Sequence, residues 1–334
     1  MISTASSAPR PARTAPPQAV GWRPLVRAGE AEGPETSTLG LVGDAVLDET
    51  ARIVVLDVGA NRVGVFDRHG KAVRSLGKAG RGPGEFIGPV ALALHDTHVY
   101  VLDRINRRVE IFDVGSGART GSFQVPLSAE DLCFVGDRLL LLGALDGNLI
   151  HEVSPTDGEI LRSFAPDPDS GDPLLSSYRA GGYMACGPGD EVTFLPLLRP
   201  QVTRFRASTG RPLGTVALPG YRAVQVRRLE NGAVSFVAPD GGSHDYASSI
   251  VPLSNGDQLV QVGEIRDGAT TRHEFESLRS FILSWRDRTV RTGPEEIPRV
   301  VYTRNDTALA AFSSPFPAVW MIDLPSLQRK NPDE

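Results

Sequence analysis

The chain has 334 residues, a formal net charge of −5 and 40% hydrophobic residues. This length would allow two domains, but a repeat architecture lets one all-β domain reach the same size. The 35 basic and 40 acidic residues are interspersed without a long basic run, which argues against a dedicated nucleic-acid-binding protein. No run of 18 uninterrupted apolar residues occurs, so we expect no membrane span.

The first 20 residues form a region of distinct composition. They are rich in Ala, Pro, Ser and Arg, contain no acidic residue and lack the apolar core of a signal peptide. We expect residues 1–20 to be a disordered tail, with a transit-like peptide or a replaced export signal as alternatives. The compartment is unknown from the sequence, and we expect the cytoplasm unless an export signal has been removed.

Two segments near the N-terminus repeat each other without a gap. Residues 45–67 and 91–113 align at a spacing of 46 residues (91 − 45). Each copy contains two short apolar strands, which in the first copy are Ile53–Leu56 and Val63–Phe66. A repeat in the forties with about four strands per unit is typical of a β-propeller blade. The matching pairs are Leu56 and Leu102, Asp57 and Asp103, Arg62 and Arg108, Val63 and Val109, Phe66 and Phe112, and Asp67 and Asp113.

Weaker copies follow in phase, and they predict four further blades. Their first strong strands begin at Leu139, Val192, Ile250 and Val300. The segment 221–245 falls outside the repeat, and we interpret it either as an extra hairpin or as part of a distorted fifth blade.

The last copy lacks an outer strand, and the N-terminal region can supply it. Trp22–Gly29 matches Val73–Gly80, the outer strand of the first copy. Pairing both ends of the chain in one sheet would remove an exposed edge. We therefore predict an all-β fold, a six-bladed β-propeller of four-stranded blades over residues 21–326, closed by the N-terminal strand and followed by a polar tail at 327–334.

The residues of this repeat carry a family resemblance. The linker Gly80–Phe86 (GRGPGEF) and the pattern LDxxxxRVxxFDxxG of the first two blades resemble the NHL-repeat-like six-bladed β-propeller family. That resemblance implies the fold but hardly a function, because its members include protein-binding and RNA-binding propellers, sensor domains, and a few lyases and hydrolases. In the repeat itself we expect Asp57 and Asp103 to accept hydrogen bonds from turn N–H groups. Arg62 and Arg108 should bury their stems and meet carboxylates.

The two cysteines give no metal-site spacing. Cys133 and Cys186 both lie in apolar, strand-like stretches. We expect buried free thiols, with a single disulfide as the alternative.

A catalytic constellation is not evident in the sequence. The six histidines form no HExxH motif, and no paired CxxC or GxSxG motif occurs. We expect no cofactor. Two alternatives stay open: zinc held as in the amidating lyases of this propeller class, and calcium near Glu85, Asp245 and Asn305 as in lactonase-like propellers.

The loops that enter each blade surround one end of the channel in a propeller, and such loops carry binding residues on a rigid scaffold. We predict a monomeric, non-enzymatic binding or scaffold propeller that recognises a peptide, protein or small ligand at that face. The alternative is a metal-dependent lyase or lactonase-like hydrolase with its site at the same face. A long charged connection, 266–276, could cover the channel mouth. The candidate ligand-binding residues are Arg81, Glu85, Tyr178, Arg179, His244, Asp245, Tyr246 and Arg304.

Overall fold

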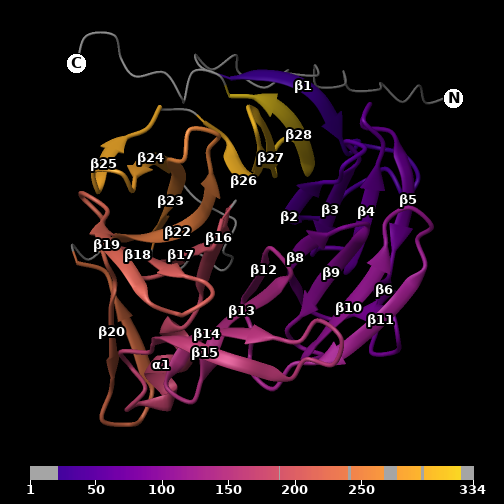
Figure 1. Ribbon diagram of the computed structural model, residues 1–334. Coiled ribbons are helices and arrows are strands. Elements are labelled where there is room, and N and C mark those ends of the chain that lie inside the picture. The colour runs from indigo at the N-terminus through magenta and orange to yellow at the C-terminus, as the bar shows by residue number, and fades with distance from the viewer. Residues whose placement is uncertain (1–21, 188, 240–241, 267–276, 295–296, 325–334) are drawn as a thin grey trace, which may run out of the picture.

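The computed structural model describes residues 22–187, 189–239, 242–266, 277–294 and 297–324. It contains six four-stranded antiparallel sheets arranged in a ring, which confirms the predicted six-bladed propeller (Figure 1). The two predicted tails and most of the 266–276 connection lie outside the described residues.

Each of the first five blades uses four strands that follow one another in the chain, with the first strand innermost. Blade 1 comprises β2 (Val42–Leu47), β3 (Ile53–Asp57), β4 (Arg62–Phe66) and β5 (Ala72–Leu76). Blade 2 comprises β8 (Pro89–His95), β9 (His98–Asp103), β10 (Arg108–Asp113) and β11 (Arg119–Gln124). Blade 3 comprises β12 (Asp131–Val135), β13 (Arg138–Leu145), β14 (Asn148–Val153) and β15 (Ile160–Pro166). Blade 4 comprises β16 (Gly182–Cys186), β17 (Glu191–Pro196), β18 (Gln201–Arg206) and β19 (Pro212–Ala217). Blade 5 comprises β22 (Ser243–Pro252), β23 (Gln258–Arg266), β24 (Leu278–Ser284) and β25 (Thr289–Thr292).

The sixth blade joins the two ends of the chain. It comprises β26 (Arg299–Arg304), β27 (Thr307–Phe312) and β28 (Ala318–Asp323), with β1 (Arg23–Ala28) as its outer strand. The antiparallel register runs from Arg23 opposite Asp323 to Ala28 opposite Val319. An ion pair of 3.1 Å joins the Arg23 guanidinium and the Asp323 carboxylate. This arrangement is the closure predicted from the match between Trp22–Gly29 and the outer strand of the first copy.

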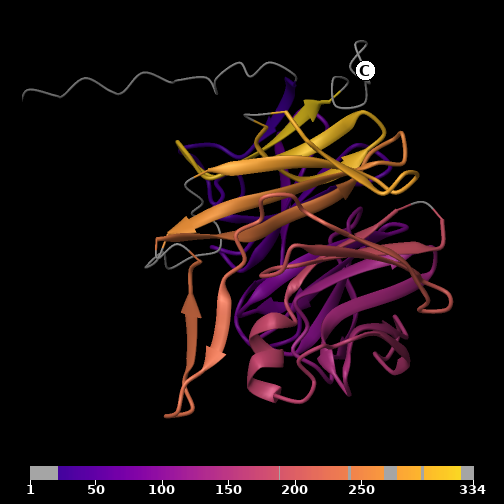
Figure 2. The same cartoon turned by 90° about the vertical axis from the view of Figure 1, so that its left-hand side faces the viewer.

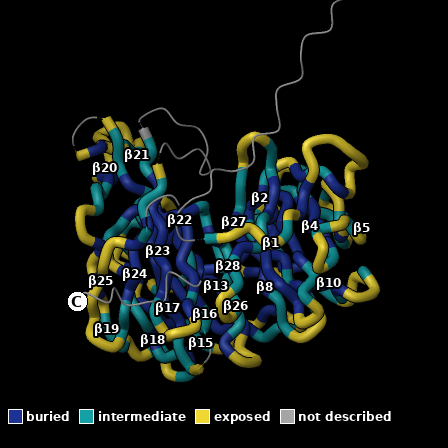
Figure 3. The backbone as a smooth tube through the Cα atoms, turned by 90° about the horizontal axis from the view of Figure 1, so that it is seen from above, coloured by how far each residue is buried: buried dark blue, intermediate teal, exposed yellow. Residues whose placement is uncertain are grey.

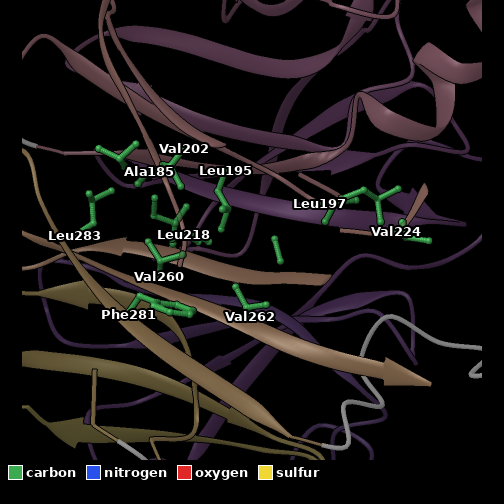
Figure 4. Close-up of a cluster of buried hydrophobic side chains, with 14 of the residues drawn as sticks. Ala185, Leu195, Leu197, Val202, Leu218, Val224, Val260, Val262, Phe281 and Leu283 are labelled. Carbon is green, nitrogen blue, oxygen red and sulfur yellow. The ribbon is translucent and has the colours of Figure 1, made fainter. Parts of the chain in front are cut away.

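The core lies between the blades. Within the described residues, six buried apolar clusters form, one at each interface between neighbouring blades. Figure 4 shows the cluster between blades 4 and 5, where Leu195 and Val202 face Val260 and Phe281. Because both faces of each blade pack on a neighbouring blade, the middle strands are continuous apolar runs and do not alternate between apolar and polar residues.

Blade 1 illustrates how burial changes from the axis outwards. All five residues of β3 and all five of β4 are buried, whereas the outer strand β5 alternates between half-buried and exposed positions before a buried Leu76. Figure 3 shows the same trend, with exposed residues gathered in the connections and at the periphery. The strong repeat signal of residues 45–67 therefore comes from the most deeply packed part of the blade.

The repeated Asp and Arg residues have the structural roles that the sequence suggests. Asp57 is fully buried and accepts N–H groups of Gly40, Leu41 and Ala60 at 3.0–3.1 Å. Arg62 pairs with Asp57 at 3.4 Å and donates to the Thr38 carbonyl at 2.7 Å. This Asp–Arg pair ties the connection entering blade 1 to the turn between its middle strands.

In the second copy the equivalent Asp and Arg bind the linker between blades 1 and 2, although Arg108 forms its ion pair with Glu110. Asp103 accepts the N–H groups of Ile87 and Gly88 at 2.9 and 3.1 Å. Arg108 donates to the carbonyls of Arg81, Gly82 and Glu85 at 3.1, 2.5 and 2.7 Å. The linker also forms a short parallel pair, β6 (Lys78–Ala79) with β7 (Glu85–Phe86).

Two insertions depart from the blade pattern. The helix α1 (Pro173–Arg179) precedes blade 4 and is capped by Asp172, whose side chain accepts the N–H groups of Leu174 and Leu175. The hairpin of β20 (Gln225–Arg228) and β21 (Val234–Val237) precedes blade 5 and forms its own two-stranded sheet. Figure 2 shows this hairpin, in orange, projecting beyond the blades beside α1. The segment 221–245 thus provides an extra hairpin, and only its last residues join blade 5.

Candidate functional site

A cavity runs along the axis of the propeller, between the innermost strands. Its volume is about 390 Å³, and β2, β8, β12, β16, β22 and β26 all contribute to its wall. The connections that lead into these strands form one side of the propeller, which we call the entry face. The turns that follow these strands form the opposite side, which we call the exit face.

Two aspartates stand in the wall near the entry face. Asp44 is the third residue of β2, and Asp131 is the first residue of β12. Asp44 accepts the N–H groups of Ala45 at 2.8 Å and Leu92 at 3.2 Å. Asp131 accepts those of Leu132 at 2.8 Å and Met184 at 2.6 Å. Each carboxylate therefore binds its own strand and the innermost strand of the next blade.

Both carboxylates are surrounded by protein, yet both side chains line the cavity. Burial raises the pKa of Asp44 to about 6, against the opposing effect of its two N–H donors and of Arg299. The pKa of Asp131 is raised to about 8, mainly by burial; the Met184 N–H opposes this rise, and the negative charge of Asp44 contributes to it. Strongly shifted groups in a concave site are typical of binding and catalytic sites.

The two arginines of the cavity wall are engaged by backbone carbonyls. Arg299 donates to the carbonyls of Ser248, Val42 and Gly43 at 3.4, 3.5 and 3.0 Å, and so braces β26 against β22 and β2. Arg304 donates to the Asp48 carbonyl at 2.8 Å. These guanidinium groups hold neighbouring blades together.

A disulfide also stands in the cavity wall. Cys133 of β12 and Cys186 of β16 are bonded, with 6.0 Å between their Cα atoms. The prediction of free thiols is therefore wrong. The bond joins the innermost strands of blades 3 and 4, where residues one blade apart come side by side.

Of the predicted site residues, Arg304 lines the cavity. It is the last residue of β26, so it lies toward the exit face rather than among the entry loops. Arg81 lies exposed in the linker to blade 2, and its carbonyl accepts from Arg108. Glu85 accepts the Gly82 N–H at 2.7 Å and pairs with Lys78 at 3.4 Å. These contacts, the Gly82 N–H first, lower the pKa of Glu85.

Tyr178 and Arg179 lie on α1 and contact the projecting hairpin. The ring of Tyr178 packs edge-on against Phe236, with 5.4 Å between centroids. Arg179 pairs with Asp169 at 3.0 Å and donates to the Val226 carbonyl at 3.2 Å. Asp169 also pairs with Arg199. This part of the entry face is thus held together by its own polar network.

His244, Asp245 and Tyr246 follow Ser243 at the start of strand β22, before the residues of that strand that line the cavity. Asp245 is fully buried and accepts the backbone N–H and the guanidinium of Arg222 at 2.6 and 2.8 Å. Arg279 is a third donor to it. Tyr246 packs on the apolar cluster between blades 4 and 5. The Asp245 carboxylate is therefore part of a structural network with Arg222 and Arg279.

Asp44, Asp131 and Arg299 are the polar groups that sequence reasoning missed. Asp44 directly precedes the repeated segment 45–67, at a position where the 46-residue spacing places Val90 in the second copy. Asp131 likewise precedes an apolar strand. A charged residue inside an otherwise apolar innermost strand is a signal that could have identified both.

The sequence leaves a zinc site and a calcium site open as alternatives. In the part of the chain that the structure describes, no group of three or more His, Cys, Asp or Glu side chains is arranged to hold a metal ion. Among the same residues, no helix has the length and hydropathy of a membrane span.

Comparison with known proteins supports the fold. The DUF5128 family model, described as a 6-bladed beta-propeller, matches residues 35–142, which cover blades 1 and 2 and the start of blade 3. No curated protein matches this chain. The NHL-repeat resemblance stays a prediction.

Solved structures of similar architecture cover nearly the whole chain. A protein from Bacteroides fragilis superposes with a TM-score of 0.60 at 11% identity, covering 91% of this chain and 95% of that one. The WD40 repeats of RRP9 give 0.57 at 11% identity, covering 92% and 98%. Virginiamycin B lyase from Staphylococcus aureus gives 0.50 at 11% identity, covering 91% and 99%. At such identities these similarities show that the chain shares a β-propeller fold with proteins of different functions.

Proposed function

We propose that this protein is a binding propeller that holds a small ligand, or a side chain of a bound peptide, in its axial cavity. The observation that carries the proposal is the cavity itself, with a volume of about 390 Å³ and walls from all six blades. Ligand pockets span roughly 300–1,000 Å³ and combine apolar walls with a few polar groups. Here the apolar wall includes Leu92, Met184 and Ile250, and the polar groups are Asp44, Asp131 and Arg299.

The rigidity of the wall also favours binding. Innermost strands are held to one another by the Asp44 and Asp131 hydrogen bonds, by Arg299 and by the disulfide. A preformed cavity loses little conformational entropy when a ligand enters it.

A variant that fills the cavity tests this proposal. Val301 is half-buried in the cavity wall, and Val301→Trp would place an indole there. Leu161→Trp is the matched control, because Leu161 is 58% exposed on the outer strand of blade 3. A library of metabolite-sized compounds is screened by thermal shift, and hits are measured by calorimetry. We expect hits that bind the wild type and Leu161→Trp equally and lose binding to Val301→Trp.

Equal binding to all three proteins would place the ligand elsewhere, and a screen without any hit would contradict the proposal. The metal-dependent lyase or hydrolase alternative has a separate readout. Metal analysis of protein purified without added metal would support that alternative if it found stoichiometric zinc or calcium.

A further inference from the structure

The charges that line the axial cavity are unequal. Among the described residues that line it, five are acidic (Asp44, Glu49, Asp96, Glu130 and Asp131) and two are basic (Arg299 and Arg304). Both arginines are engaged by backbone carbonyls, as shown above. Glu130 is engaged by Arg104, which donates to both of its oxygens at 2.8 and 2.9 Å. Glu49 and Asp96 are exposed near the exit face.

Asp44 and Asp131 are therefore the acidic groups inside the cavity that have backbone N–H donors and no side-chain ion pair within the described residues. Each of their four oxygens accepts one N–H, and a carboxylate oxygen has room for a second donor. The strand between them, β8, contributes only apolar side chains to this part of the wall, including Ala91 and Leu92. Among the described residues, Arg299 acts on Asp44 through its charge but forms no ion pair with either carboxylate.

We infer that the axial cavity takes a ligand with a protonated amine or guanidinium group, which binds between the carboxylates of Asp44 and Asp131. This inference rests on the proposed function, because it names the ligand class for the same cavity. Tyr183, Phe134 and Tyr302 also line the cavity and add aromatic surface that the alkyl chain of such a ligand can contact.

Proton release is a specific signature of this ligand class. Burial holds part of the Asp44 and Asp131 population protonated near neutral pH, with pKa values of about 6 and about 8. A bound cation favours the ionised carboxylates, so its binding releases protons and strengthens as pH rises from about 6 to about 8. The other charged groups facing these two residues are Glu130 beside Asp131 and Arg299 on β26. Tyr183 on β16 contributes a phenol, and β8 and β22 contribute no charged side chain to this part of the wall.

Three ligands of matched length test the inference. Pentane-1,5-diamine, pentane-1,5-diol and glutarate are titrated into the full chain by calorimetry at pH 6, 7 and 8, each in two buffers of different ionisation enthalpy. We expect the diamine alone to bind, with proton release and with affinity that increases with pH. Asp44→Asn and Asp131→Asn should each weaken diamine binding about tenfold to hundredfold, the range for hydrogen bonds to charged groups.

Glu230→Gln is the matched control, because it makes the same charge change on an exposed side chain that does not line the cavity, and it should bind the diamine like the wild type. If the cavity variants fail to fold, the ligand series and its pH dependence on the wild type still decide the matter. Binding of glutarate or the diol in place of the diamine would overturn the inference while leaving the proposed function standing. Calcium chloride is titrated in the same way, and calcium binding that Asp44→Asn or Asp131→Asn abolishes would also overturn the inference, as would binding of none of the probes. The library screen tests the proposed function separately.

Discussion

At the scale of single residues, acidic groups in this propeller serve two distinct purposes. Asp57 and Asp103 are satisfied by loop N–H groups, and Asp57 has an arginine partner as well, so they fix the connections that enter blades 1 and 2. Asp44 and Asp131 instead bridge innermost strands and border the cavity. The residue type is the same, but its position relative to the axis decides which role it has.

This difference leads to a pH-dependence prediction for Asp131. Its pKa is raised from 3.8 to about 8 in the folded protein. Between those values the folded state binds more protons than the unfolded state, so this group's contribution to stability falls as pH rises through the window. We therefore expect Asp131→Asn to gain thermal stability relative to the wild type between about pH 4 and about pH 8.

Melting temperatures of both proteins across this range provide the measurement. The criterion is the slope of melting temperature against pH. The side-chain amide of Asn has one acceptor oxygen, so the variant loses one of the two hydrogen bonds from backbone N–H groups, and this loss lowers its stability by the same amount at every pH. The melting curve of Glu230→Gln, a variant that removes a negative charge from an exposed side chain, should run parallel to that of the wild type. Parallel curves for Asp131→Asn and the wild type would show that the pKa of Asp131 is not raised.

At the scale of elements, the innermost strands of neighbouring blades are linked by contacts that the repeat pattern alone does not reveal. Cys133 and Cys186 are separated by 53 residues, close to the length of one blade, and both occupy innermost strands. Residues one repeat apart on such strands become neighbours across a blade interface. That spacing could have predicted the disulfide, whereas apolar flanking residues alone suggested free thiols.

The disulfide should contribute measurably to the stability of the joined blades. Closing a loop of 53 residues lowers the entropy of the unfolded chain and stabilises the fold by about 4 kcal/mol in the chain-entropy description. We expect the Cys133→Ala, Cys186→Ala double variant to unfold at lower urea concentration by a corresponding amount. Reducing agent should lower the midpoint of the wild type and leave that of the double variant unchanged. Two reactive thiols in the denatured, non-reduced wild type would contradict the bond.

At the scale of the whole molecule, the fold was predictable and the lining of the axial cavity was not. The 46-residue spacing of the first two blades and the Trp22–Gly29 echo are local patterns that depend on packing shared by every blade. The cavity depends instead on residues that the ring brings together from separate blades. Asp44 and Asp131 belong to blades 1 and 3, and no spacing within one repeat links them. Predicted residues such as Tyr178 and Asp245 lie in irregular segments, where the structure shows local networks.

The pairing of β1 with β28 joins the two ends of the chain in blade 6. Without this strand, β28 would expose an unpaired edge, and the interface between blades 6 and 1 would lose Ala28, a fully buried member of its apolar cluster. We expect deletion of residues 1–30 to abolish cooperative unfolding, because blade 6 would lose both its outer strand and its packing on blade 1. Deletion of residues 1–18 should leave the melting transition unchanged, because β1 begins at Arg23. Thermal unfolding followed by circular dichroism distinguishes the two, and a longer deletion that melts like the intact chain would show that the ring closes without β1.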